Sequence, residues 1–120
     1  MAKPALMLAA MPLMLAASTD QLLPLKHGIF VTTDTPCKGA SNVSIMSYWG
    51  GDNALNVSQA ECRIDRVTHT GTRYTVTRTC TELQSGSSLG KDTVRLTIAD
   101  PSSFTIDGTA YRWCGMKVQF

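Results

Sequence analysis

Residues 61–83 read ECRIDRVTHTGTRYTVTRTCTEL and decide the fold. Apolar and polar side chains alternate along both arms of this stretch, which is typical of half-buried β-strands. Gly71-Thr72 between the arms predicts a two-residue type II′ turn, because glycine adopts a positive φ without steric cost. The alternation breaks between Ile64 and Val67, where one extra residue predicts a β-bulge. The stretch is therefore predicted to be a long, bulged hairpin.

The turn and the bulge together set the register of this hairpin. The predicted cross-strand pairs are His69 with Tyr74, Val67 with Val76, Ile64 with Arg78, and Cys62 with Cys80. Four cysteines allow three disulfide pairings, and this register favours Cys62–Cys80, which leaves Cys37 with Cys114. An even number of cysteines in a short exported chain is typical of a disulfide framework. The cysteines are separated by 24, 17 and 33 intervening residues, so no tight turn brings two of them to one zinc ion.

The remaining chain predicts further short strands between turn residues. The expected strands are residues 28–33, 43–49, 94–98 and 104–106, a strand carrying Tyr111 and Trp113, and a closing strand at 118–120. Between the second strand and the central hairpin, either residues 54–57 form a short third strand or residues 58–61 form a single helical turn. Asp107-Gly108 predicts a type I′ hairpin that places Phe104 opposite Tyr111. Seven or eight strands in meander order predict a single all-β domain, either a small antiparallel barrel or a two-sheet sandwich.

The first 18 residues have the pattern of a signal peptide. Lys3 precedes an almost wholly apolar run, Ala5–Ala17, which is too short to span a bilayer. Ala16 and Ser18, two small residues at the −3 and −1 positions, predict cleavage between Ser18 and Thr19. Cleavage there leaves a β domain of residues 19–120 in the periplasm or outside the cell. Loss of Lys3 leaves 10 basic against 9 acidic side chains. The resulting net charge is close to zero, so it does not indicate that the protein binds nucleic acid or associates stably with a membrane.

Residues able to carry chemistry are few and scattered. His27 and His69 are expected to be solvated, and the sequence has no nucleophile elbow, phosphate loop or dinucleotide fingerprint. Charged residues near the ends of the central hairpin are expected to form ion pairs on a solvated face: Glu61, Asp65, Glu82, Arg63, Arg66 and Arg78. We therefore expect no enzymatic activity, no cofactor, and no catalytic or metal-binding residue.

An aromatic loop is the candidate for partner binding. It contains Tyr48, Trp49, Asp52 and Asn53 around two glycines, and tyrosine and tryptophan supply rigid contact area. The competing interpretation is that Trp49 plugs one end of the barrel. Asn42 and Asn56 each begin a glycosylation sequon, whose use the sequence leaves open.

The framework residues also resemble a known class. Gly28-x-Phe30 before Pro36-Cys37, the hairpin ending in Thr79-Cys80, and the closing Tyr111-Arg112-Trp113-Cys114 resemble small exported four-cysteine bacterial proteins of unassigned function. In size, export and β architecture the chain is also similar to periplasmic inhibitors of C-type lysozyme. It lacks the Ser-Gly-x-x-x-Tyr loop of those inhibitors, so the resemblance implies compartment and fold but transfers no functional residue.

These observations favour a non-enzymatic periplasmic or secreted domain that binds a protein partner, such as an envelope protein or an exogenous hydrolase. One alternative is a barrel that carries an apolar ligand in a cavity lined by Phe30, Ile45, Val76, Leu96 and Phe104. A hydrolase is a more remote alternative.

Export predicts the mass of the native protein. We expect intact-mass spectrometry to show a chain that begins at Thr19 and carries two disulfides, lighter by two hydrogens for each bridge than its reduced form. Retention of Met1, or four free thiols, would contradict both the signal peptide and the disulfide framework.

Overall fold

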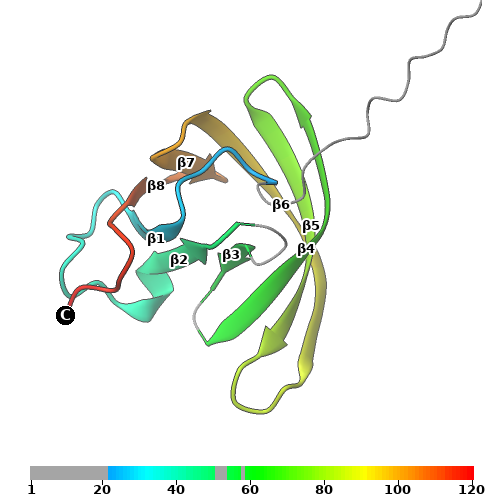
Figure 1. Ribbon diagram of the computed structural model, residues 1–120, viewed down its shortest axis with the longest axis horizontal. Coiled ribbons are helices and arrows are strands. Elements are labelled where there is room, and N and C mark those ends of the chain that lie inside the picture. The colour runs from blue at the N-terminus through cyan, green and yellow to red at the C-terminus, as the bar shows by residue number, and fades with distance from the viewer. Residues whose placement is uncertain (1–21, 51–53, 58) are drawn as a thin grey trace, which may run out of the picture.

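The computed structural model describes residues 22–50, 54–57 and 59–120 as one nearly closed antiparallel β-barrel (Figure 1). The predicted signal peptide lies outside the described residues. The elements are β1 (Gly28–Thr32), the 3-10 turn η3 (Asn42–Ser44), β2 (Ile45–Tyr48), β3 (Ala54–Asn56), β4 (Ala60–Thr70), β5 (Arg73–Glu82), β6 (Ser88–Asp100), β7 (Ser103–Ile106) and β8 (Thr109–Trp113). In the described part of the chain, no helix is long and apolar enough to cross a membrane.

The strands form one sheet in the order β3-β2-β1-β8-β7-β6-β5-β4. Chain neighbours pair with each other except at β3 and β4, and β1 pairs with β8. The fold is therefore a meander barrel with a seam between β3 and β4. This confirms the all-β barrel and decides against the two-sheet sandwich.

The central hairpin has the predicted register. Cys62 lies opposite Cys80, the four predicted pairs all form, and the register shifts between Ile64 and Arg66, so Asp65 is the bulged residue. Gly71 has a φ of 59°, as the first central position of a type II′ turn requires.

The β7–β8 hairpin also forms as predicted. Asp107 and Gly108 have φ values of 49° and 82°, which match a type I′ turn. Phe104 lies opposite Tyr111, and their rings stack with centroids 5.0 Å apart. Local turn chemistry therefore determined both hairpins.

The barrel interior is filled by side chains that alternate inward along the strands. Its buried members include Phe30, Met46, Tyr48, Leu55, Ile64, Val76, Val94, Leu96, Ile98 and Phe104. Leu23 and Leu25, which precede β1, are buried in the same cluster. The backbone N–H of Leu23 donates to the Tyr48 hydroxyl (3.0 Å), so the segment before β1 is fixed to the core. Burial raises the pKa of the Tyr48 phenol.

Both predicted disulfides are present. Cys37–Cys114 joins residues 77 positions apart and Cys62–Cys80 joins residues 18 positions apart. The Cys62 and Cys80 Cα atoms lie 4.0 Å apart, close to the spacing of a non-hydrogen-bonded cross-strand pair. Loop closure in the unfolded chain predicts a stabilisation of about 4.5 and about 3 kcal/mol respectively. Two such bridges fit an oxidising extracellular or periplasmic compartment.

Three predicted element boundaries were wrong. Val43 lies in η3 and is exposed, because a 3-10 turn closed by the hydrogen bond from Ser44 N–H to the Ser41 carbonyl precedes β2. Residues 118–120 form no strand; Gln119 makes an isolated bridge to Lys38. Trp49 follows the end of β2 rather than lying within it.

Arg78 corrects the expected solvated ion-pair face. The register turns this side chain into the barrel, where Arg78 is only 8% exposed. Its guanidinium donates to both carboxylate oxygens of Asp92 on β6 (2.8 and 3.1 Å) and, at 2.6 Å, to the backbone carbonyl of Leu55 on β3. Asn56 adds a second link across the seam, since its side-chain oxygen accepts a hydrogen bond from the N–H of Cys62 (2.7 Å). Side chains therefore join β3 to the long hairpin where strand pairing stops.

We expect Arg78→Gln to lower the free energy of unfolding by about 2–3 kcal/mol, because it removes charge-assisted hydrogen bonds from a buried site. Arg66→Gln, on the exposed side of β4, should change it by less than about 0.5 kcal/mol. Urea denaturation followed by circular dichroism measures both. Equal stability of the two variants would show that the seam does not depend on the guanidinium.

Candidate functional site

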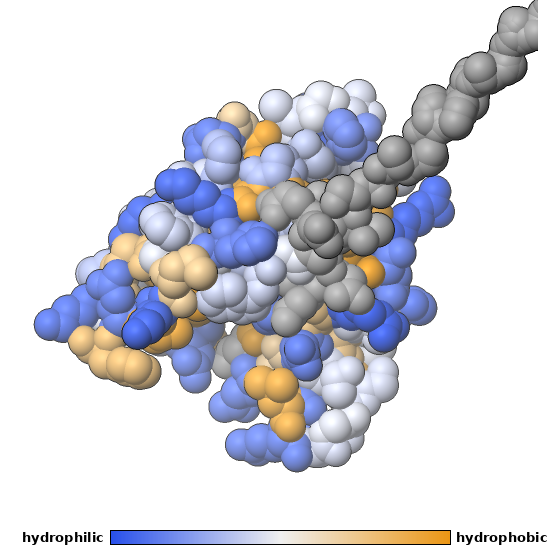
Figure 2. All heavy atoms as spheres, viewed as in Figure 1, coloured by the Kyte–Doolittle hydropathy of each residue, from blue (hydrophilic) through white to orange (hydrophobic). Residues whose placement is uncertain are grey.

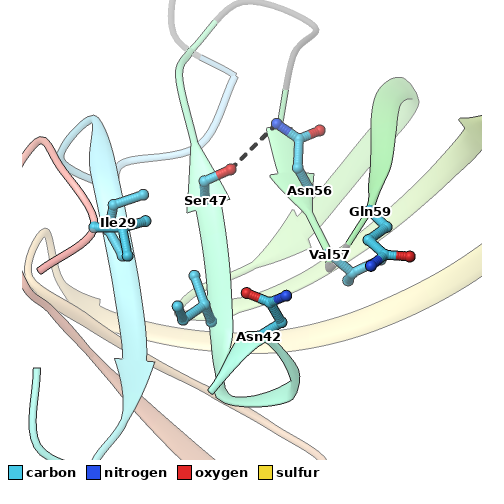
Figure 3. A pocket seen from close by; sticks show the side chains of 8 residues that line it. Ile29, Asn42, Ser47, Asn56, Val57 and Gln59 are labelled. Carbon is cyan, nitrogen blue, oxygen red and sulfur yellow. Dashed lines mark hydrogen bonds between the residues drawn. The ribbon is translucent and has the colours of Figure 1, made fainter. Parts of the chain in front are cut away.

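The candidate site is a groove on the outer surface of β1, β2 and β3 (Figure 3). It consists of two adjoining depressions, of about 190 and 340 Å³, that share Ser47, Asn56 and Val57. The first is also lined by Ile29, Asn42, Ile45, Gln59 and Val118, and the second by Trp49, Ala60, Glu61 and Leu83. We refer to the two depressions together as the β2–β3 groove.

Strand alternation places these side chains. On β2, Met46 and Tyr48 point into the barrel, so Ile45 and Ser47 point outward. Ile29 pairs with Ser47 and shares this outer face. Ile29 and Ile45 belong to a small second cluster with Val31 and Cys114. The Cys37–Cys114 disulfide therefore supports one wall of the β2–β3 groove.

The floor of the groove is polar and held in place. The Asn56 side-chain nitrogen donates to the Ser47 hydroxyl (3.3 Å), as Figure 3 shows, while its oxygen accepts from Cys62. The carboxamides of Asn42 and Gln59 lie at the edges, and among the described residues neither has an assigned hydrogen bond. Thus one amide is fixed and two can reach a ligand.

The rim is apolar at both ends. Trp49 is 37% exposed, Leu83 63% and Val118 37%. Figure 2 shows the molecular outline indented between the part that carries η3 and the lower end of the long strands. Exposed apolar side chains gathered around a depression are typical of interaction surfaces.

The structure separates the residues of the predicted aromatic loop. Trp49 lies at the groove, whereas Tyr48 is fully buried, so its ring offers no surface to a partner. The expectation for Tyr48 is corrected by strand alternation, which turns neighbouring side chains to opposite faces. Asp52 and Asn53 lie outside the described residues. Val57, Gln59 and Leu83 were missed. The pairing of β2 with β3 places Val57 beside β2, whereas Leu83, which follows β5, reaches the groove only when the barrel closes.

Other polar residues form local interactions. His69 stacks on Tyr74 with ring centroids 4.7 Å apart. Asp65 accepts hydrogen bonds from Lys91 (2.9 Å) and Thr79, which lower the pKa of its carboxyl to about 2. Tyr111 and Trp113 are partly buried and pack against the core. Within the described residues there is no free cysteine and no cluster of three or more potential metal ligands.

Comparison with protein-family models, with curated proteins and with solved structures finds no match to this chain. The resemblance to four-cysteine exported proteins and to lysozyme inhibitors accordingly stays a prediction.

The exposure of Trp49 predicts a small effect on stability. We expect Trp49→Ala to lower the free energy of unfolding by less than about 1 kcal/mol, whereas Tyr48→Ala should lower it by about 3–5 kcal/mol because it empties part of the core. Urea denaturation compares the two variants. A loss at Trp49 as large as that at Tyr48 would mean that Trp49 is a structural plug.

Proposed function

We propose that this protein is a non-enzymatic, exported binding module whose β2–β3 groove holds an extended segment of a partner protein. The observation that carries the proposal is the groove itself, which combines exposed apolar side chains with side-chain amides. The partner is an envelope protein or an exogenous protein such as a hydrolase, in line with the architectural resemblance to lysozyme inhibitors.

The chemistry of the lining favours a peptide segment over a sugar or a lipid. Asn42 and Gln59 offer both hydrogen-bond donors and acceptors, which match backbone N–H and C=O groups. Ile45, Val57 and Trp49 supply apolar contact along the same groove. Alternating side chains of an extended segment can use both kinds of contact.

Strand addition at the edge of β4 is less favourable. The bulge at Asp65 interrupts this edge, and Arg63 and Arg66 lie on either side of the bulge. Bulges and charges are devices that discourage edge-to-edge pairing. The groove is therefore the better candidate for a protein contact.

Export supports the same function. The pattern of residues 1–18 predicts export by a signal peptide, and the two disulfides are stable in the compartment to which it leads. We place the mature domain in the periplasm or outside the cell, with no stable insertion in the membrane.

The apolar-carrier alternative has less support. Phe30, Val76, Leu96 and Phe104 pack together in the core, and the Phe30 and Phe104 rings lie 5.1 Å apart. Ile45 was expected to line the same cavity but faces the outer surface, because it lies one residue before the inward-facing Met46. Packed side chains fill the positions that the ligand would need.

Site-specific photo-crosslinking tests the proposal. A photoreactive amino acid at Asn42 or at Glu61, at opposite ends of the groove, should crosslink the same protein in an extract of the producing cell's envelope or surroundings. The exposed position Thr93 on β6, which does not line the groove, should not. We then expect Trp49→Ala to weaken binding of the purified partner at least tenfold while the far-UV spectrum stays unchanged.

Two outcomes would refute this function. Equal crosslinking from Thr93 would indicate nonspecific contact, and full affinity of the Trp49→Ala variant would remove Trp49 from the interface. Recovery of a glycan or lipid, without a protein, would replace the proposed partner class.

A further inference from the structure

We propose a second site, independent of the groove: a depression on the outer face of β5, β6 and β7 that binds a phosphate or sulfate group. The depression has a volume of about 470 Å³. Its lining includes Arg73, Thr75, Arg95, Thr97, Thr105 and Asp107. None of these residues lines the β2–β3 groove.

The strand register brings the basic and hydroxyl groups together. Arg73, Thr97 and Thr105 are aligned across β5, β6 and β7, and Thr75 is aligned with Arg95 in the next row. Arg73 and Arg95 are thus diagonal neighbours on one face, with Cα atoms about 7–8 Å apart. Two long guanidinium side chains at this separation can reach one tetrahedral anion, and the threonine hydroxyls can donate to its remaining oxygens.

Charge pairing separates these two arginines from several other basic residues of the barrel; among the described residues Arg66 on β4 also lacks a carboxylate partner, but it does not line the depression. Arg63 and Lys91 pair with Asp65, Arg78 pairs with Asp92, and Arg112 donates to the backbone carbonyls of Thr32 and Thr35. Among the described residues, neither Arg73 nor Arg95 forms an ion pair with a carboxylate. Two positive charges on one concave face are therefore left for an external anion.

The hydroxyl lining indicates the chemical class of the anion. A carboxylate has two oxygens, which one guanidinium fork can satisfy. Phosphate and sulfate offer additional acceptors that match a second fork and the threonine hydroxyls. The group can be a free ion, a soluble ester or a lipid headgroup, because all of them present the same oxygens.

Asp107 limits the affinity. It lines the depression from the β7–β8 turn and adds one negative charge next to the two arginines. Asp107→Asn removes this charge and suits the turn, because asparagine tolerates the positive φ of this position. The variant should bind the anion more tightly.

Titration followed by amide NMR tests the site on the mature, disulfide-bridged protein. Sodium phosphate and sodium sulfate, added at constant ionic strength against sodium chloride, should produce saturable shifts at Thr75, Arg95 and Thr97. We expect the Arg73→Gln/Arg95→Gln double variant to weaken binding at least tenfold, and Asp107→Asn to strengthen it about twofold or more. Arg66→Gln is the matched control, since Arg66 is exposed on β4 outside the depression, and it should leave the affinity unchanged.

Co-sedimentation with vesicles identifies the source of the phosphate. Binding to phosphatidylglycerol vesicles, but not to phosphatidylcholine vesicles, through the same two arginines indicates a lipid headgroup; saturable phosphate binding without vesicle binding indicates a soluble ion or ester. Shifts that stay linear, that chloride reproduces, or that Arg66→Gln reduces as much as the double variant would overturn the site. Because none of the substituted residues lines the groove, these results are independent of the protein-binding test.

Discussion

The barrel depends on one guanidinium. β3 has three residues and β4 has eleven, so strand pairing stops between them, and the sheet has a seam where a closed barrel would have a ladder. Arg78 extends from β5 to the Leu55 carbonyl on β3 and is neutralised by Asp92 on β6. A buried charge is stable only when it is paired and hydrogen bonded, and this one makes both kinds of contact. The cost of burying it is offset by joining the short strands to the long hairpin.

Arg78 faces inward because it lies two residues after Val76 and two before Cys80, and alternate side chains of β5 point into the barrel. The bulge at Asp65 sets the matching register on β4, so that Cys62 and Ile64 lie opposite Cys80 and Arg78. The disulfide and the seam contact thus lie on the same inner face. The β2–β3 groove lies on the outer side of the same region, where Asn56 on β3 lines the groove and also bonds across the seam to Cys62.

The two proposed sites lie on different faces of the barrel and rely on different kinds of interaction. The β2–β3 groove offers apolar contact and amides, with Trp49 as the large side chain at its rim. The depression on β5–β7 offers two arginines and hydroxyls. A nearly neutral chain can still present such a site, because Asp65 and Asp92 pair with other basic groups while Arg73 and Arg95 form no ion pair among the described residues. Net charge describes the average field of the molecule, whereas recognition depends on which charges lack a partner.

The sequence by itself determined the local structure: the II′ and I′ turns, the bulge, the register of the central hairpin and hence both disulfides. These follow from interactions over a few residues, such as a positive φ at Gly71 or the alternation on either side of it. It also placed Trp49 among the candidates for binding. Tertiary structure decided what no local pattern contains. Closure of the sheet buried Arg78 and Tyr48 and brought Leu83 to the groove beside β2. The pairing of β5 with β6 and of β6 with β7 aligned Arg73 with Thr105. The reason is physical: the side-chain period of a strand fixes two faces, and only packing decides which face meets water and which strands become neighbours.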